Sequence, residues 1–529
     1  MSPLAIGLVL ALAPTGQQPF VERLSLDPTG QEATGSSGVV DLSADGRFVV
    51  FQSDASLVPG DVDGTTDVYL RDRLTGALEL VSVTDAGAQT ATPCLAPSVS
   101  DDGQRVAFYS TATELTPDLD TNGTFDVFVR DRGAGTTTLV SVAAAGGAGD
   151  SYSFFPDLSG DGRYVAFESV AGDLAPGDAP GWKDIFRRDL QLGVTELVSA
   201  GASGAVPNGA SQQPSISADG SRVAFESTAT NLGPPDTGPT RDVYVRDLVT
   251  GVTTMASLKS TGGQSILGSS RPALSADGTM VAFEGSGLVP LDLNGATDVH
   301  VRDLVAGTTT RVSTDGVGRE GNGYSTDPAI SADGRFVAFS SVADNLLLED
   351  HAPWPYRQVY VKDRSYGTTY LVSPTPTGAY GNQASNLPAI SADDGQVAFD
   401  SYASNLVPGD GNDSQDVFLG ELPVAGPRLR LVQHGSSSSG APVRVELGNA
   451  SPTSVFVVAV ALDDQGPLPT PWGLAYVPSA DLLLPLATDA SGEASLSMPL
   501  PGLVGRVLCV HGLDLATSTL STADSLLVE

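Results

Sequence analysis

The 529-residue chain has few of the side chains from which chemical sites are usually built. Its two cysteines, Cys94 and Cys509, cannot form a disulfide framework, so they make either one bridge or two separate buried thiols. Its four histidines are scattered with no His-x-x-x-His pair, which argues against a zinc site. Basic residues number 27 against 62 acidic ones. The resulting formal charge of −35 argues against nucleic acids and anionic membranes as partners, because both would be repelled.

Long apolar runs are also lacking. Near the N-terminus, Leu4 to Ala13 form an apolar run that is too short to cross a bilayer. We interpret residues 1–16 as a signal peptide, and the alternative is a plain disordered N-terminus. The sequence therefore predicts a secreted, periplasmic or cell-surface protein with no membrane span, and we expect a monomer.

What the chain does have is one stretch, Leu42–Phe51, that occurs seven times. Its serine recurs at intervals of 56 to 60 residues, at Ser43, Ser100, Ser159, Ser217, Ser275, Ser331 and Ser391. A fixed period of this length indicates a repeat architecture.

Each repeat predicts four short antiparallel strands. A Ser-x-Asp-Gly turn joins two apolar runs into a hairpin, since Asp caps its own backbone and Gly accepts the positive φ of a tight turn. A third strand follows, as in Asp67–Asp72, and a Thr-Gly turn leads to a fourth, as in Leu80–Ser82. Four-stranded units repeated radially form a propeller, so we predict an all-β, seven-bladed β-propeller over residues 20–422.

The two ends of the repeat region indicate how the ring closes. The seventh repeat lacks a fourth strand after Leu419, whereas an extra strand, Val21–Leu26, precedes the first repeat. We predict that this N-terminal strand completes the last blade, which removes two exposed sheet edges at once.

The repeat also carries a family resemblance. The phrase Pro-x-Ile-Ser-Ala-Asp-Gly-x-x-Val-Ala-Phe, as in Pro328–Phe339, is followed by Asp-Val-Tyr-Val-Arg-Asp, as in Asp242–Asp247. Together they resemble the WD40-like (TolB-like, PD40) propeller repeats of bacterial secreted proteins over residues 20–422. The resemblance implies the fold and is weak as to function, because one fold hosts unrelated activities. TolB itself differs, since it carries an α/β domain ahead of six blades.

The 58-residue pattern ends near Pro423–Pro427. The remaining residues alternate without helical periodicity, in short runs such as Val443–Leu447 and Val455–Val460. Short strands separated by Gly, Pro and Ser predict a small β-sandwich domain over residues 427–529. The serine run Gly435–Gly440 lacks the spacing of a Gly-x-Ser-x-Gly nucleophile elbow, so no peptidase domain is expected.

Four loops repeat an acidic phrase. If the first strand of each blade is innermost, the loops between strands two and three share one face with the connections between blades, and such long loops usually carry function. Oxygens at i, i+2 and i+6 around a glycine suit Ca²⁺, which prefers six to eight oxygen ligands. An ordinary Asx turn is the alternative. The candidate metal ligands are Asp61, Asp63, Asp67, Asp120, Asn122, Asp126, Asp292, Asn294, Asp298, Asp410, Asn412 and Asp416.

Two loops that depart from this phrase place aromatic rings beside cations. Such side chains could stack on a sugar or a peptide, although each ring could instead cover its own loop. The candidate ligand-binding residues are Trp182, Lys183, His351, Trp354, Tyr356 and Arg357.

The prominent aspartates repeat in register from blade to blade, which is typical of structural residues, because an active site is needed once. We therefore predict a non-catalytic module that binds a protein or glycan on the loop face, with Ca²⁺ as a candidate stabilising ion. Two alternatives stay open: a propeller-based polysaccharide lyase or glycosidase, and a periplasmic TolB-like envelope scaffold. Paired carboxylates with a raised pKa at the axial mouth of the loop face would favour the enzyme, and a lining of Gly, Ser and Thr would favour the binding module.

Overall fold

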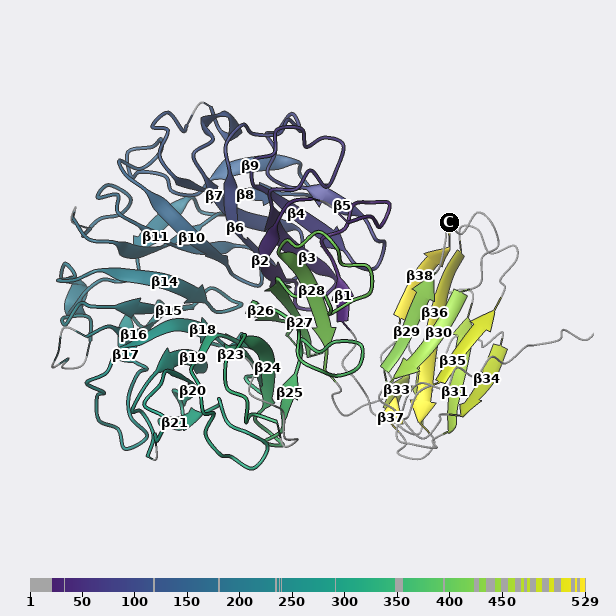
Figure 1. Ribbon diagram of the computed structural model, residues 1–529. Coiled ribbons are helices and arrows are strands. Elements are labelled where there is room, and N and C mark those ends of the chain that lie inside the picture. The colour runs from purple at the N-terminus through teal and green to yellow at the C-terminus, as the bar shows by residue number, and fades with distance from the viewer. Residues whose placement is uncertain are drawn as a thin grey trace, which may run out of the picture. The chain divides into compact units, whose positions relative to one another are not determined.

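The computed structural model describes residues 21–422 except 33, 118, 179–180, 234–235, 237, 239, 291, 348–354 and 393–394, together with ten strands between residues 428 and 528. Residues 19–422 form one compact unit, and the C-terminal strands belong to another. Seven four-stranded antiparallel sheets make up the first unit, so the predicted seven-bladed propeller is confirmed (Figure 1).

Six blades are built from strands that follow one another along the chain, and the seventh takes one strand from the N-terminus. Blade one contains β2 (Ser37–Leu42), β3 (Phe48–Ser53), β4 (Asp67–Asp72) and β5 (Leu78–Leu80). Blade two contains β6 (Cys94–Val99), β7 (Arg105–Ser110), β8 (Asp126–Asp131) and β9 (Thr136–Leu139). Blade three contains β10 (Ser153–Leu158), β11 (Tyr164–Ser169), β12 (Asp184–Asp189) and β13 (Val194–Leu197). Blades four and five contain β14 (Ser211–Ile216), β15 (Arg222–Ser227), β16 (Asp242–Asp247) and β17 (Val252–Met255); and β18 (Ser269–Leu274), β19 (Met280–Gly285), β20 (Asp298–Asp303) and β21 (Thr308–Arg311). Blades six and seven contain β22 (Ser325–Ile330), β23 (Phe336–Ser341), β24 (Gln358–Asp363) and β25 (Thr369–Leu371); and β26 (Ser385–Ile390), β27 (Gln396–Ser401), β28 (Asp416–Glu421) and β1 (Val21–Arg23). Two short 3₁₀ turns, η1 (Thr113–Leu115) and η2 (Ala202–Gly204), lie in loops.

Each blade has a pair of neighbouring rings in its two central strands, which are stacked in six blades and tilted in blade five. In blade one, Phe51 of β3 lies opposite Tyr69 of β4, with ring centroids 5.9 Å apart and both side chains fully buried. The equivalent pairs are Phe108–Phe128, Phe167–Phe186, Phe225–Tyr244, Phe283–His300, Phe339–Tyr360 and Phe399–Phe418. A cross-strand aromatic pair stabilises a sheet by roughly 0.5–1.5 kcal/mol beyond the area that it buries.

The repeated Ser-x-Asp-Gly turn joins the first two strands as predicted. Ser43 Oγ donates to Asp45 Oδ1 (2.7 Å) and accepts from Phe48 N (2.9 Å), so one hydroxyl links both ends of the turn. Gly46 has a φ of +66°, which an L side chain would adopt only with strain. The turn of blade seven includes residues 393–394, which lie outside the described part of the chain.

The first strand of each blade is innermost. The first strands of consecutive blades contact one another all the way around the ring, from β2 through β6, β10, β14, β18, β22 and β26 back to β2. Strand direction then places the Ser-x-Asp-Gly turns on one face of the propeller. The loops between strands two and three and the connections between blades lie on the opposite face, which we call the loop face.

A β-bulge interrupts each inner strand near its loop-face end. The ladder between strands one and two shifts register there in all seven blades. The third residue of the strand takes a positive φ in each case: Val39, Ala96, Phe155, Gln213, Arg271, Asp327 and Leu387. A bulge adds one residue to the strand and redirects the side chains beside it.

The N-terminal strand closes the ring as predicted. Val21, Glu22 and Arg23 pair with Gly420, Leu419 and Phe418 of β28, so the ladder is shorter than the predicted 21–26. The contact continues past the ladder, since Leu24 N donates to the Val417 carbonyl (2.8 Å) and Leu24 is buried.

The C-terminal strands form three antiparallel sheets. One contains β29 (Arg428–Gln433), β30 (Val443–Gly448) and β35 (Ala494–Met498). A second contains β34 (Leu482–Ala487), β31 (Val455–Ala461), β36 (Arg506–Asp514), β37 (Thr519–Leu520) and β38 (Asp524–Val528), and β32 (Leu468–Thr470) pairs with β33 (Gly473–Ala475). The β-sandwich over residues 427–529 stays a prediction.

Several predictions about the ends of the chain fall outside the described residues. Residues 1–16, interpreted as a signal peptide, are among them. Cys94 is a free buried thiol, whereas the side chain of Cys509 in β36 is not described. Among the described residues, no helix is long and apolar enough to cross a membrane.

Candidate functional sites on the loop face

Every blade has a buried acceptor at the start of its third strand. In blade one, Asp67 Oδ1 accepts a hydrogen bond from Ser82 Oγ (2.6 Å), and the same hydroxyl accepts one from Val68 N (3.1 Å). The equivalent pairs are Ser141–Asp126, Ser199–Asp184, Ser257–Asp242, Ser313–Asp298, Ser373–Gln358 and Ser25–Asp416. One oxygen of each aspartate therefore fastens strand four to strand three, and the other oxygen faces the acidic loop.

In blade one, the structure brings the three predicted aspartates together. One carboxylate oxygen each from Asp61, Asp63 and Asp67 lies within 4.8 Å of the others, so the group could hold a metal ion. Gln89 already joins two of them, because its Nε2 donates to Asp61 Oδ1 (2.8 Å) and to Asp67 Oδ2 (2.8 Å). Asp63 also caps the backbone of Thr65 (2.8 Å), as in the Asx-turn alternative.

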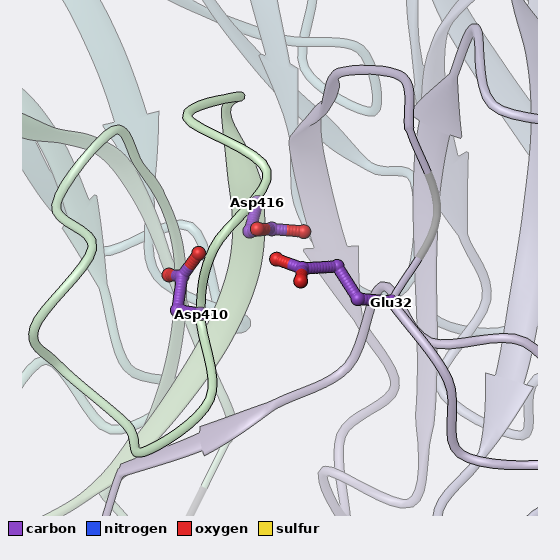
Figure 2. Close-up of side chains that lie close together, drawn as sticks. All are labelled: Glu32, Asp410 and Asp416. Carbon is purple, nitrogen blue, oxygen red and sulfur yellow. The ribbon is translucent and has the colours of Figure 1, made fainter.

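In blade seven, Asp410 and Asp416 meet a carboxylate that the sequence did not predict. Figure 2 shows Glu32, from the segment after β1, pointing toward Asp410 and Asp416 of the last blade. Arg23 Nη1 lies 2.8 Å from Glu32 Oε1 and 3.4 Å from an oxygen of each aspartate. Asn412 Nδ2 donates to Asp416 Oδ2 (3.4 Å). The three carboxylates therefore surround a guanidinium group.

Blade five repeats this arrangement. Asp292, Asp298 and Glu320 have one oxygen each within 4.8 Å of the others. Arg311 Nε lies 3.2 Å from Asp298 Oδ2, and its Nη1 lies 2.7 Å from Glu320 Oε1. The predicted Asn294 turns away from the carboxylates and donates to the Gly321 carbonyl (2.6 Å).

Sequence reasoning missed the glutamates and arginines of these two blades, although a signal was present. Arg and Glu stand nine residues apart both in blade seven (Arg23, Glu32) and in blade five (Arg311, Glu320). The equivalent positions of the other blades are Leu80 and Gln89, Leu139 and Ala148, Leu197 and Val206, Met255 and Gln264, and Leu371 and Tyr380. Arg and Glu therefore occur together or not at all, as a charge pair requires.

In blade two, Asp120 and Asp126 are both buried. The predicted Asn122 donates to the Gly149 carbonyl (2.8 Å). Burial raises the pKa of Asp126 to about 7, the hydrogen bond from Ser141 offsets part of this, and the charge of Asp120 adds to it.

The predicted ligand-binding residues divide into three groups. His351 and Trp354 lie outside the described residues. Trp182 and Tyr356 are exposed. Lys183 and Arg357 each directly precede a third strand. Lys183 pairs with Glu168 of a second strand, and Arg357 pairs with Asp327 of an inner strand.

The structure brings four positions of each repeat together at the loop-face ends of the inner strands, which we call the inner rim. They are the second and third residues of strand one, the fifth of strand two, and the residue before strand three. These positions differ from blade to blade, whereas those beside them repeat. In strand two, the fourth residue is Phe in all seven blades, but the fifth is Gln52, Tyr109, Glu168, Glu226, Glu284, Ser340 and Asp400.

The fifth residue of strand two connects neighbouring blades. Glu168 Oε2 accepts from the bulge amide of Gln213 (3.1 Å), and Glu226 Oε2 accepts from that of Arg271 (2.9 Å). Gln52 and Glu284 do the same for Ala96 and Asp327. The backbone pattern thus favours an acceptor here, while the choice of acceptor changes from blade to blade.

Blades two and three give the inner rim an aromatic arc. The ring of Tyr109 lies 5.5 to 5.7 Å from those of Phe125, Phe154 and Phe155. Phe155 is 40% exposed, although it stands on an inner strand. Lys183 Nζ lies 5.6 Å from the centre of the Phe154 ring, a cation–π contact that joins this arc to the next one.

Blades three to six give the inner rim an ionic arc. Its four pairs are Lys183–Glu168 (2.6 Å), Arg241–Glu226 (3.1 Å), Arg271–Glu284 (3.7 Å) and Arg357–Asp327 (3.4 Å), and Arg271 also contacts Asp327. The carboxylate side chains are 0–9% exposed, whereas the cationic ones are 33–50% exposed. The charged atoms that face solvent on this arc are therefore cationic, in a chain whose formal charge is −35.

The ionic arc also contains a carboxyl group with a raised pKa, that of Glu284. Burial raises its pKa to about 7, and the charges of Arg271 and Arg357 offset part of that effect. Glu226 lies close enough to raise it further. A carboxyl that exchanges a proton near neutral pH, with a second carboxyl nearby, is the feature that would favour an enzyme.

No protein-family model matches the chain, and no curated protein sequence matches it. Similar solved structures include an oligogalacturonate lyase in complex with manganese, which is 14% identical (79% of this chain and 96% of that chain covered, TM-score 0.46). A putative TolB from Agrobacterium tumefaciens is 17% identical (52% and 80% covered, TM-score 0.34), and the RRP9 WD40 repeats are 10% identical (76% and 97% covered, TM-score 0.38). TolB-like and WD40 propellers are thus among the folds that this chain resembles, and likenesses of this degree carry no argument about activity.

Proposed function

We propose that the propeller is a binding module for an acidic glycan, which it holds at the inner rim of the loop face. The observation that carries the proposal is the layering of the ionic arc: buried carboxylates lie beneath, and partly exposed Lys183, Arg241, Arg271 and Arg357 lie above. Each buried carboxylate orients the cation above it, so the donors are fixed before a ligand arrives.

The aromatic arc supports a sugar as the ligand. A pyranose ring presents a flat face of C–H groups that stacks on an aromatic ring, and its carboxylate or hydroxyl groups accept hydrogen bonds from guanidinium groups. Phe155 and the Lys183 side chain lie at the junction of the two arcs, where Lys183 covers Phe154. A uronate residue could therefore stack on one arc and place its carboxylate on the other.

We expect the purified protein to bind uronate polysaccharides, such as alginate and hyaluronate, more tightly than neutral dextran. The double variant Arg241→Ala, Arg271→Ala should lose at least about tenfold in affinity, because a hydrogen bond to a charged group contributes roughly 1.5–3 kcal/mol. Isothermal titration with oligosaccharides of defined length measures this change. Equal binding of acidic and neutral polymers would contradict the proposal.

Three further variants serve as controls. Arg319→Ala removes an exposed arginine that pairs with Asp315 on the loop side of blade five, and we expect its affinity to be unchanged. Trp182→Ala tests the aromatic residue that was predicted from the sequence, and Phe155→Ala tests the one that lies at the inner rim. Loss of affinity in Trp182→Ala alone would move the binding site outward to the blade-three loop.

A second candidate function, a glycan lyase or glycosidase, is favoured by the raised pKa of Glu284. It predicts product release from the same polysaccharides, measured as new reducing ends, and loss of turnover with retained binding in Glu284→Gln. The binding-module proposal predicts no turnover by the unmodified protein. Secretion is part of the main proposal and rests on the apolar run Leu4 to Ala13.

A further inference from the structure

The acidic pairs of the loop face differ in what neutralises them. In blade one, the Gln89 amide bridges Asp61 and Asp67. Blade four has the same bridge, because Gln264 Nε2 donates to Asp236 Oδ1 (2.6 Å) and Asp242 Oδ2 (3.0 Å).

Blades five and seven use a guanidinium group instead. Arg311 and Arg23 occupy the space among the carboxylates of their blades and supply a full positive charge. A metal ion there would have to displace an arginine that already pairs with all three carboxylates of blade seven, or with Asp298 and Glu320 of blade five.

Of the four loops with the acidic phrase, blade two alone has neither the glutamine nor the arginine. The position of Gln89, seven residues after the serine of strand four, is Ala148, and the position of Arg23 and Arg311 is Leu139. A methyl group and an isobutyl group cannot donate a hydrogen bond. The loop keeps its acidic pair, yet its bridging donor is missing.

The atoms of blade two reflect this difference. Asp120 and Asp126 are 1% and 0% exposed, and the Oδ2 atom of each is buried without a hydrogen-bond partner. Thr116 Oγ1 is also buried without a partner, in the turn where the Thr116 carbonyl accepts from Asp120 N (2.9 Å). Buried carboxylate oxygens without a donor are costly, since each such oxygen has lost its hydration and gained no hydrogen bond in return.

We propose that blade two binds a divalent, oxygen-preferring cation such as Ca²⁺ between Asp120 Oδ2 and Asp126 Oδ2. The cation takes the place that the amide of Gln89 or Gln264 fills in blades one and four. Two carboxylates supply its charge balance, and water completes a coordination shell of six to eight oxygens. The calcium prediction made for four loops is thereby restricted to one of them, and it is independent of any ligand at the inner rim.

The test exchanges glutamine and alanine at this position between blades one and two. Full-length protein stripped of metal is titrated with CaCl₂ in a calorimeter. We expect one site in the unmodified protein, with a Kd of roughly 0.1–1 mM as in extracellular modules. Ala148→Gln should abolish this site by placing an amide between the aspartates, and Gln89→Ala should create a second site in blade one.

Melting temperatures provide a readout that does not depend on heat signals. At about 10 mM CaCl₂, the unmodified protein should melt about 2 °C higher than in NaCl of matched ionic strength. Ala148→Gln should show no such difference, and without calcium it should be at least as stable as the unmodified protein. This last comparison shows that the variant is folded.

Three outcomes would overturn the proposal. The first is no calcium heat and no change in melting temperature, which would mean that the aspartates share a proton instead. The second is undiminished binding by Ala148→Gln, which would place the ion elsewhere. The third is undiminished binding by Asp126→Asn, whose side chain retains the oxygen that Ser141 bonds but not the charge.

Discussion

A chain that lacks Val21 to Leu26 is expected to melt about 6 °C below the full-length protein. The deletion exposes the edge of β28, removes the buried Leu24 side chain and leaves Asp416 without the hydroxyl of Ser25, which donates to it at 2.5 Å. Burial of one leucine, several hydrogen bonds and one satisfied buried carboxylate together amount to on the order of 5 kcal/mol. Differential scanning calorimetry measures the shift.

The control is a chain that begins at residue 19 and keeps β1, for which we expect no change in melting temperature. Rescue adds specificity: a synthetic peptide of residues 19–34 should restore the melting temperature of the deleted chain. An unchanged melting curve after the deletion would show that the ring does not depend on β1 for its stability.

The propeller is also expected to be more stable at pH 5 than at pH 8, by about 10 °C in melting temperature. Burial raises the pKa of Asp41 and Asp400 to about 6 and of Asp157 and Glu284 to about 7. Between about pH 4 and 7 the folded protein therefore binds more protons than the unfolded chain, so its free energy of unfolding falls as the pH rises. Each group contributes roughly 1–3 kcal/mol.

Carboxylates with lowered pKa values act in the opposite sense at lower pH. Asp189 is one of them, because the hydrogen bond from Arg163 favours its ionised form. Protonation of such groups below about pH 4 destabilises the fold, so stability should be greatest near pH 5.

One variant isolates a single group. Asp157 accepts a hydrogen bond from Ile216 N of the next blade (2.7 Å), and an asparagine oxygen can accept the same bond. Asp157→Asn should raise the melting temperature at pH 8 and leave it almost unchanged at pH 5, whereas Glu114→Gln at an exposed site should change neither. A melting temperature that stays level or rises from pH 5 to pH 8 would refute this account of the buried carboxyls.

The architecture could be predicted because its signals are local. The Ser43 turn and the apolar runs around it each depend on neighbouring residues, and their repetition every 58 residues made the pattern recognisable. Ring closure followed from a strand missing after Leu419 and an extra one at Val21–Leu26.

The candidate sites could be predicted only in part, because some of the residues that contact them come from elsewhere in the chain. Asp61 and Asp67 were found by their spacing, but Gln89 reaches them from the connection to the next blade, 28 and 22 residues away. The acidic phrase also gave no indication that Asp120 and Asp126 differ from the rest, since the difference is located at Ala148.

The inner rim was missed for a different reason. Lys183 and Arg357 were singled out from the sequence, whereas Phe155 and Arg271, which stand on inner-strand bulges, were not. A bulge inserts one residue into a strand, so the alternation of inward and outward side chains that can be read from sequence is reversed at that point. The sequence prediction instead included Trp182, which lies in a neighbouring loop.

The strand that closes the ring is the first strand of the propeller to leave the ribosome, and its partner is among the last. Ser25 and Asp416 are 391 residues apart, which at about 5–20 residues per second means a delay of about 20–80 s. Blades one to six can each form from consecutive strands as they are made, while β1 waits as an unpaired edge. A second nascent molecule offers the same strand to the same open blade, so we expect strand exchange between neighbouring molecules to become more frequent as growing chains are more crowded.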